Sequence, residues 1–240
     1  MNKINILNIK INHVTLDETL ALIHQYIDSG KPHQICTVNI EFINEALTNK
    51  PFFEAIDKAD LALADGAGIV LSAKILKSKA LDKISGVDLT YKLCEEAAKQ
   101  GYRVFLLGGQ NGVGNKAAEV LKSLYPGINI VGTYEGNPED NNVITKIHES
   151  KPQILLVAWG APKQDLWISK NKNEINVPVM MGVGGTYDFI AGVQKRAPKV
   201  WRDLGFEWLW RLVREPWRWK RQLALPKVIL LVLWQRIRQI

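Results

Sequence analysis

The chain has 240 residues, of which 47% are hydrophobic and 23% are charged. A chain of this length buries roughly 70–75% of the surface that it exposes when unfolded, and its composition excludes disorder throughout. Cys36 and Cys94 lie in apolar contexts without the spacing of a zinc site, which argues against a disulfide framework and favours a reducing compartment. Residues 1–17 lack the apolar block of a secretory signal, so we expect a cytoplasmic protein.

The basic charge is concentrated at the C-terminal end. The formal net charge of the whole chain is +7, but residues 1–194 hold 19 basic and 21 acidic residues. Residues 195–240, here called the tail, hold twelve Lys and Arg residues, three acidic residues and six of the eight tryptophans. This change predicts a boundary near residue 195 between a nearly neutral body, residues 1–194, and a cationic, aromatic tail, residues 195–240.

Short apolar or β-branched runs recur through the body and predict strands. In chain order they are Ile4–Ile9, Gln34–Thr37, Leu61–Ala64, Arg103–Leu107, Ile128–Val131, Ile154–Ala158 and Val179–Val183. Amphipathic stretches of helical period lie between them, over Leu16–Ile27, Val87–Lys99, Val113–Leu124 and Gln164–Asn173. The alternation predicts an α/β fold with a Rossmann-like, mostly parallel sheet flanked by helices, followed by a C-terminal helical appendage.

Five loops that follow predicted strands are rich in glycine or polar residues. They are Thr37 to Glu41, Asp65 to Gly68, Gly108 to Gly114, Gly160 to Asp165 and Gly182 to Asp188. In an open parallel sheet, ligands bind where the carboxyl ends of the strands meet such loops and helix N-termini. We therefore expect these loops to line one edge of the sheet.

The loop Gly108 to Gly114 allows two interpretations. It follows a strand and precedes a helix, where backbone amides and the helix dipole can hold a phosphate. Its Gly-x-x-Gly-x-Gly spacing, however, is neither the dinucleotide fingerprint nor a Walker motif. A nucleotide-binding loop and a simple tight turn both stay open.

Polar residues also follow two other predicted strands. Asp65 comes directly after an apolar strand and before Gly-Ala-Gly, a placement that suits a general base, with a helix N-cap as the alternative. Thr37 and Asn39 repeat the arrangement after another strand, where an Asx-type turn is the alternative. Asp88 is expected to begin the helix that runs to Lys99.

No spacing in the sequence supports a metal centre, because the four histidines are scattered and no Asp-x-Asp pair occurs. A departing phosphate would therefore need protein cations. Arg211, Arg214, Arg218 and Arg221 recur at helical spacing, which predicts one stripe, although Pro216 should divide the segment into two short helices. Their planar guanidinium groups suit phosphate, and a solvated helix face is the alternative.

The tail also has the composition of a membrane-surface segment. Tryptophan interleaved with Lys and Arg is typical of a bilayer interface, where each basic residue near an anionic surface contributes about 1 kcal/mol. The seven apolar residues after Lys227 fall far short of the ~20 needed to span a bilayer, so this segment should lie on the membrane or close over the body. Nucleic acid is the competing partner, but Val, Ile, Leu and Trp clustering favours lipid.

An ordered set of motifs resembles the bacterial WecG/TagA/CpsF glycosyltransferases over essentially the whole chain. The set comprises Thr37-Val-Asn39, Asp65-Gly-Ala-Gly68, Gly86-Val-Asp88, Leu107-Gly-Gly109, Gly160-Ala-Pro-Lys-Gln164, Gly182-Val-Gly-Gly-Thr-Tyr-Asp188, Ala191-Gly192, Arg196-Ala-Pro198, Leu204-Gly-Phe-Glu-Trp208, Arg211-Leu212, Glu215-Pro216 and Arg218. Each motif is weak alone, and the ordered set is specific.

The resemblance implies an inverting transfer from a UDP-sugar to an undecaprenyl-diphosphate-linked acceptor at the inner face of the cell membrane, without an essential metal or another cofactor. For members of the wall teichoic acid pathway it implies UDP-N-acetylmannosamine as donor and the 4-hydroxyl of undecaprenyl-diphosphate-N-acetylglucosamine as acceptor. Asp65 matches the family's base, and Thr37 and Gln164 match polar residues of the same pocket. Asp188 falls in the segment that resembles the nucleotide site, and the four tail arginines lie in the appendage that completes the site.

These considerations select two groups of candidates. The candidate catalytic residues are Asp65, Thr37, Gln164, Arg211, Arg214, Arg218 and Arg221. The candidate substrate-binding residues are Asn39, Gly66, Gly108, Gly109, Gly136, Lys163, Gly184, Gly185, Asp188 and Arg196. The expected partners are the UDP-sugar, the lipid-linked acceptor and an anionic membrane surface but no nucleic acid, and a homo-oligomer is compatible with apolar surface on a body without its tail. The alternative from another class is a nucleotide- or RNA-binding regulatory protein with a nucleic-acid-binding tail.

Overall fold

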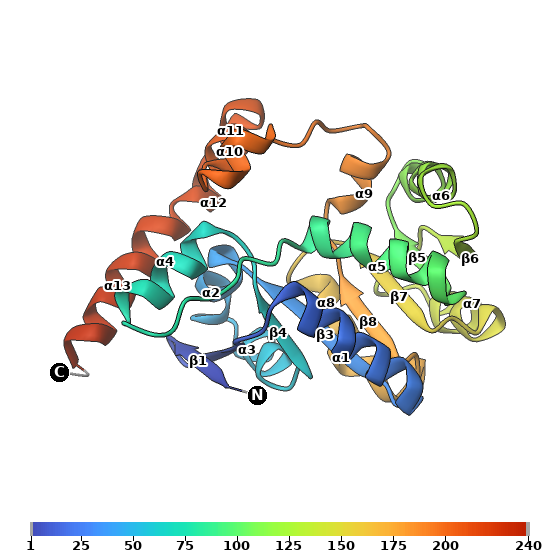
Figure 1. Cartoon of the computed structure of the whole chain (residues 1–240), viewed down its shortest axis with the longest axis horizontal. Helices are drawn as coiled ribbons and strands as arrows, with labels where there is room; N and C mark the ends of the chain where they lie inside the picture. The colour runs from blue at the N-terminus through green and yellow to red at the C-terminus, as the bar shows by residue number, and fades with distance from the viewer. Residues whose placement is uncertain (1, 239–240) are drawn as a thin grey trace.

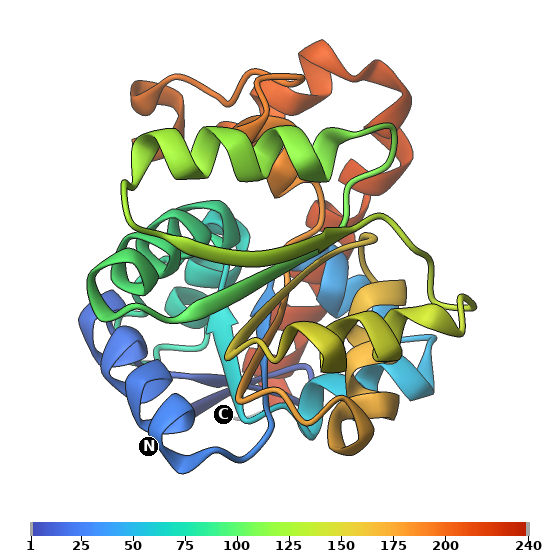
Figure 2. The same ribbon diagram turned by 90° about the vertical axis from the view of Figure 1, so that its right-hand side faces the viewer.

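A computed structural model describes residues 2–238, except for the side chain of Arg218. It confirms the predicted α/β fold, with a six-stranded parallel sheet in the order β4-β3-β8-β7-β5-β6 and helices on both faces (Figures 1 and 2). The sheet strands are β3 (His33–Val38), β4 (Leu61–Ala64), β5 (Arg103–Gly108), β6 (Asn129–Tyr134), β7 (Ile154–Ala158) and β8 (Val179–Gly182). Six of the predicted strands therefore correspond to the six strands of this sheet.

The first predicted strand, Ile4–Ile9, is wrong as a single element. It contains an antiparallel hairpin of β1 (Lys3–Ile6) and β2 (Ile9–Asn12). Leu7 and Asn8 form the turn with φ of 48° and 70°, the left-handed values that a two-residue hairpin turn needs. Because leucine rarely adopts this conformation, the sequence carries no strong turn signal there.

The body helices surround the sheet. They are α1 (Leu16–Ser29), α2 (Ile40–Ala46), α3 (Lys50–Asp57), α4 (Ala67–Ile75), α5 (Gly86–Gln100), α6 (Val113–Leu124), α7 (Asn142–Ser150), α8 (Lys163–Ile175) and α9 (Thr186–Ile190). The four predicted helices are present as α1, α5, α6 and α8. Asp88 lies in the first turn of α5 rather than at its start, because Ser85 is the N-cap.

Two apolar layers enclose the sheet. Side chains of α1, α5 and α6 pack on one face around Ile35, Leu106 and Leu156. The other face is covered by α2 and α3 over Cys36 and by α7 and α8 over Leu155. Successive residues of a strand point to opposite faces, so buried strands with both faces covered read as nearly continuous apolar runs.

The tail contains α10 (Lys199–Asp203), α11 (Glu207–Arg214), a 3₁₀ turn η1 (Pro216–Arg218), α12 (Trp219–Gln222) and α13 (Ala224–Arg238). The predicted break at Pro216 is confirmed, since α11 ends at Arg214. The expected single stripe of arginines is wrong. Proline lacks an amide hydrogen and restricts the residue before it, so the four arginines belong to three short elements rather than one helix.

The last helix, α13, packs on the body beside α2 and α4 (Figure 1). Its Ala224, Val228 and Val232 are buried in the same apolar cluster as the hairpin. The Gln235 side chain accepts a hydrogen bond from the amide of Leu7 and donates one to the carbonyl of Asn5. Within residues 2–238, no helix combines the length and apolar character needed to cross a membrane. The division at residue 195 stays a prediction.

Candidate active site

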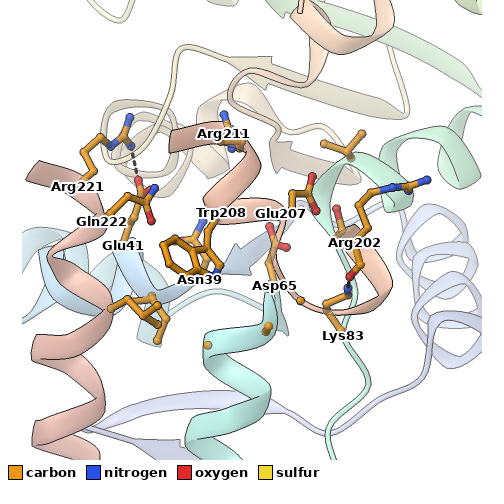
Figure 3. A pocket seen from close by; sticks show the side chains of 18 of the residues that line it. Asn39, Glu41, Asp65, Lys83, Arg202, Glu207, Trp208, Arg211, Arg221 and Gln222 are labelled. Carbon is orange, nitrogen blue, oxygen red and sulfur yellow. Dashed lines mark hydrogen bonds and ion pairs between the residues drawn. The ribbon is translucent and has the colours of Figure 1, made fainter. Parts of the chain in front are cut away.

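Two adjoining cavities open where the carboxyl ends of the strands meet the tail. The larger has a volume of about 350 Å³ and is lined from the ends of β3, β4, β7 and β8, from α2 and from the tail. The smaller, of about 180 Å³, lies between the N-termini of α2 and α4, the loop before α5 and the tail (Figure 3). Of the predicted site residues, both linings contain Asn39, Asp65, Arg211 and Arg221, the larger adds Thr37, Gln164, Gly184, Gly185 and Asp188, and the smaller adds Gly66.

Asp65 lies at the junction of the two cavities. It directly follows β4, and its backbone amide donates to the carbonyl of Val38 at the end of the neighbouring strand, over 2.8 Å. The alternative assignment as a helix cap is wrong, because the N-cap of α4 is Gly66 and no side chain caps this helix. The carboxylate of Asp65 instead accepts a 3.5 Å hydrogen bond from the amide of Gly86 at the start of α5, and Asp65 lines both cavities.

The surroundings of Asp65 suit proton transfer near neutral pH. Burial raises the pKa of its carboxyl group from 3.8 to about 7. The amide of Gly86 lowers the pKa, the nearby Glu207 raises it, and Arg196 and Arg211 lower it. A carboxylic acid with a pKa close to the ambient pH can accept and release a proton readily.

Thr37 and Asn39 have different local roles. Asn39 caps α2, because its Oδ1 accepts a 3.0 Å hydrogen bond from the amide of Phe42, three residues further on rather than the two of an Asx turn. Thr37 is buried at the end of β3, close to the backbone of Gly86, where an added Cβ would lie 3.0 Å from the Thr37 hydroxyl oxygen. Both residues nevertheless line the larger cavity.

Gln164 joins two of the predicted loops. Its Oε1 accepts hydrogen bonds from the amides of Gly160, over 2.9 Å, and Gly184, over 3.0 Å. The side chain is buried and packs against Gly182, which leaves no room there for a Cβ. Gln164 therefore fixes the loop after β7 to the loop after β8 at the floor of the larger cavity.

Asp188 lies on α9 at the edge of this cavity. Its partly buried carboxyl group has a raised pKa, first because of burial and then because of the charge of Glu215, although Arg211 lowers it. The charge of Arg211 thus lowers the pKa of both Asp65 and Asp188, and its guanidinium carbon lies 5.5 Å from the ring centre of Phe189.

The remaining tail arginines are placed differently. Arg221 reaches across the site and forms a 2.6 Å ion pair with Glu41 on α2 (Figure 3). Arg214 lies over the ring of Trp210, 5.1 Å from its centre, and is outside both linings. The side chain of Arg218 lies outside the described part of the structure.

Five predicted binding residues lie outside the linings of the two cavities: Gly108, Gly109, Gly136, Lys163 and Arg196. Gly108 ends β5 and Gly109 follows it, and close contacts with the backbones of Ala158 and Gly114 account for both glycines. The amide of Gly112, at the start of α6, donates to the carboxylate of Glu135 over 2.6 Å. This end of the sheet therefore has the features of the tight-turn alternative.

Gly136, Lys163 and Arg196 have other surroundings. Gly136 follows the edge strand β6 against Tyr134 and Val143. Lys163 is exposed at the first residue of α8. Arg196 binds Asp88 through two nitrogens and approaches Glu207, so it connects the start of the tail to α5 and α11.

The sequence did not single out several lining residues. Lys83 and Arg202 both line the smaller cavity, and the Lys83 ammonium donates to the Arg202 carbonyl over 2.8 Å. Trp208 lines the same cavity, whereas the sequence marks it only as one of the tail tryptophans and as part of a motif. Lys83 lies in an irregular loop without a motif, so only the packing of the tail reveals its place.

Within residues 2–238, no three His, Cys, Asp or Glu side chains gather as a metal site would require.

Comparisons with known proteins identify the family of the chain. Residues 4–240 match the Glycosyl transferase WecG/TagA/CpsF family. The chain is similar to proteins named N-acetylglucosaminyldiphosphoundecaprenol N-acetyl-beta-D-mannosaminyltransferase. It is 34% identical to that of Bacillus subtilis (strain 168) over 87% of this chain and 82% of the relative. It is 33% identical to that of Staphylococcus aureus (strain MRSA252) over 91% and 86%. This chain is therefore an enzyme of the WecG/TagA/CpsF family of glycosyl transferases.

Proposed function

We propose that this glycosyltransferase moves N-acetylmannosamine, or a related hexosamine, from its UDP derivative to undecaprenyl-diphosphate-linked N-acetylglucosamine. The reaction would serve the synthesis of wall teichoic acid or another surface polysaccharide. Two findings support the proposal: the activity for which the relatives are named, and the position of Asp65 where two cavities meet. The position of Asp65 carries the mechanistic part, because a base shared by two cavities can contact both substrates.

In the proposed reaction, Asp65 accepts the proton of the acceptor hydroxyl group. The hydroxyl oxygen forms a bond to the anomeric carbon while the bond from that carbon to the UDP oxygen breaks on the opposite face, which inverts the configuration. The bonding electrons leave with UDP. General-base assistance of this kind contributes typically 10²–10⁴ in rate.

The larger cavity suits the donor. Its floor is made of the loops that Gln164 joins, and the guanidinium groups of Arg211 and Arg221 reach it from the tail. Negative charge develops on the diphosphate as the glycosidic bond breaks, and arginines already in place stabilise it without rearrangement. Arg221 would exchange its partner Glu41 for a phosphate oxygen when the donor binds.

The smaller cavity suits the acceptor. Lys83 and Arg202 provide cations for its diphosphate, and Trp208, Leu225 and Ile40 provide apolar contacts for the first part of the lipid. Asp65 lies between these groups and the larger cavity. The acceptor sugar would then project toward the donor with one hydroxyl group near the base.

We place the enzyme at the inner face of the cell membrane as a peripheral protein. The tail exposes large apolar side chains next to basic ones, including Trp217 at 74% exposure and Leu230 at 65%. The ring of Trp234 lies 3.4 Å from the guanidinium carbon of Arg238. Such pairs suit the boundary between lipid headgroups and acyl chains.

The experiment is incubation of the enzyme with UDP-N-acetylmannosamine and a short-chain lipid-diphosphate-N-acetylglucosamine, followed by mass measurement of the lipid. We expect a gain of one N-acetylhexosamine residue and release of UDP. UDP-N-acetylglucosamine serves as the control for the configuration of the donor sugar. If neither donor extends the acceptor while the protein is folded, the proposed reaction is wrong.

A further inference from the structure

The tail brings a carboxylate, as well as cations, to the junction of the cavities. Glu207 begins α11 and lines the smaller cavity together with Asp65. Figure 3 shows the two carboxyl groups next to one another. Among the charged groups that act on Asp65, Glu207 has the largest effect. Removal of the tail would therefore remove an acidic neighbour of the base.

A clamp centred on Arg196 holds Glu207 in this position. The Arg196 guanidinium donates to both carboxylate oxygens of Asp88, over 2.5 and 2.8 Å, and to the hydroxyl of Ser85 over 3.2 Å. Its Nε donates to Glu207 Oε1 over 3.4 Å. Ser85 and Asp88 belong to the start of α5, whereas Glu207 starts α11, so one guanidinium ties the tail to the body. A two-pronged guanidinium–carboxylate contact of this kind fixes orientation as well as distance.

We propose that Glu207 is a positioning residue for the reaction assigned above: docking of the tail places its carboxylate opposite Asp65, where it strengthens Asp65 as a proton acceptor. The inference rests on the proposed role of Asp65. Glu207 itself need not touch either substrate, because two nearby carboxylates repel one another and each then holds a proton more readily. The base would consequently work best when the tail is in place.

Other charges face the same junction and must be considered. The charged residues that line the cavities or act on Asp65 are Glu41, Glu45, Lys83, Asp188, Arg196, Arg202, Arg211 and Arg221 besides Glu207. Arg196 and Arg211 oppose the effect of Glu207 on Asp65. Glu207→Gln removes one negative charge while it keeps the shape of the side chain and an oxygen that can accept from Arg196, so it tests the contribution of this carboxylate.

The first experiment compares the pH dependence of kcat/KM for the full chain and its E207Q variant. We expect the acidic limb of the E207Q profile to move to lower pH, and the plateau to fall about tenfold because a weaker base accepts a proton less readily. Glu207→Asp keeps the negative charge, so its acidic limb should lie closer to that of the unaltered enzyme. Asp203→Asn, an exposed change of the same charge in the same tail, should leave the profile unchanged. The inference is wrong if the acidic limb of the E207Q profile lies at the same pH as that of the unaltered enzyme.

The second experiment does not depend on turnover. The carboxyl carbon of Asp65, assigned with Asp65→Asn, is followed by ¹³C NMR as a function of pH without substrates. We expect its titration midpoint to fall in E207Q and to stay unchanged in D203N. An unchanged midpoint in E207Q overturns the inference, even if the transfer reaction is confirmed. A displaced midpoint together with a failed transfer assay supports the coupling and rejects only the proposed reaction.

Discussion

At the scale of single residues, the proposed reaction depends most on Asp65. The pKa of its carboxyl group is raised to about 7, so the proposed base becomes ionised only as the pH rises through neutrality. We expect kcat/KM to increase with pH up to about 7 and then to level. Asp65→Asn should lower turnover by about 10²–10⁴ and keep UDP binding nearly intact, as judged by calorimetry. Unchanged turnover in this variant would contradict the assignment of Asp65 as the base.

The same pKa shift predicts an effect on stability. The folded protein keeps its proton on Asp65 up to about pH 7, whereas the unfolded chain releases it near pH 3.8. Between these values the unfolded chain binds fewer protons, so the contribution of Asp65 to folding stability decreases as the pH rises. Asparagine does not titrate. We expect Asp65→Asn to leave the free energy of unfolding unchanged near pH 4. At pH 8 it should raise that free energy by about 1–2 kcal/mol, after allowance for water in the cavity.

Urea unfolding at pH 4 and pH 8 measures this difference, with Asp203→Asn as the control for loss of an exposed carboxylate. An equal effect of Asp65→Asn at both pH values would show that the folded state does not hold the proton.

The sequence placed Asp65 correctly because a residue that directly follows a buried strand must emerge at the edge of the sheet. It could not identify Lys83 or Arg202, because their place depends on how the tail packs against a loop far away in the chain.

At the scale of elements, α13 contributes both to packing and to exposed surface. Val232 is fully buried against the body, whereas Leu230, two residues earlier on the same helix, is 65% exposed. We expect Val232→Asp to lower the free energy of unfolding by about 2–5 kcal/mol because it buries a charge. It should also loosen the tail and lower transferase activity. Limited proteolysis and urea unfolding check both effects.

Leu230→Asp is the matched control, since it adds the same charge to the same helix without entering the core. Equal protease sensitivity of the two variants would contradict the packing of α13 on the body. Such point changes are more informative than deletion of the tail, because a deletion would uncover the apolar cluster that Val228 and Val232 share with the hairpin. Loss of activity after deletion could then come either from the missing site residues of the tail or from the exposed apolar cluster.

Element boundaries followed from the sequence wherever periodicity was strong, as in α6, which has the predicted bounds. Prediction failed where a single residue in an unusual conformation decides the outcome, as at Leu7 in the hairpin turn. The arginine spacing was misleading for a related reason. Side-chain periodicity presumes a continuous helix, and Pro216 interrupts it between Arg214 and Arg218.

At the scale of the whole molecule, the uneven distribution of charge predicts reversible membrane association. We expect the protein to float with vesicles that contain anionic phosphatidylglycerol and to be released by salt, because contacts between exposed basic groups and headgroups are screened. Leu230→Asp should weaken flotation without affecting folding. If the protein binds neutral vesicles as strongly as anionic ones, the predicted electrostatic contribution to membrane binding is contradicted. A gel shift with RNA under the same salt conditions tests the competing nucleic-acid partner.

The hydrogen bonds of Gln235 with Leu7 and Asn5 join segments that are separated by 228 and 230 positions in the chain. A ribosome therefore makes the hairpin long before it makes α13. Because the two elements share one apolar cluster, the hairpin has no covering helix on this side until synthesis has passed residue 235.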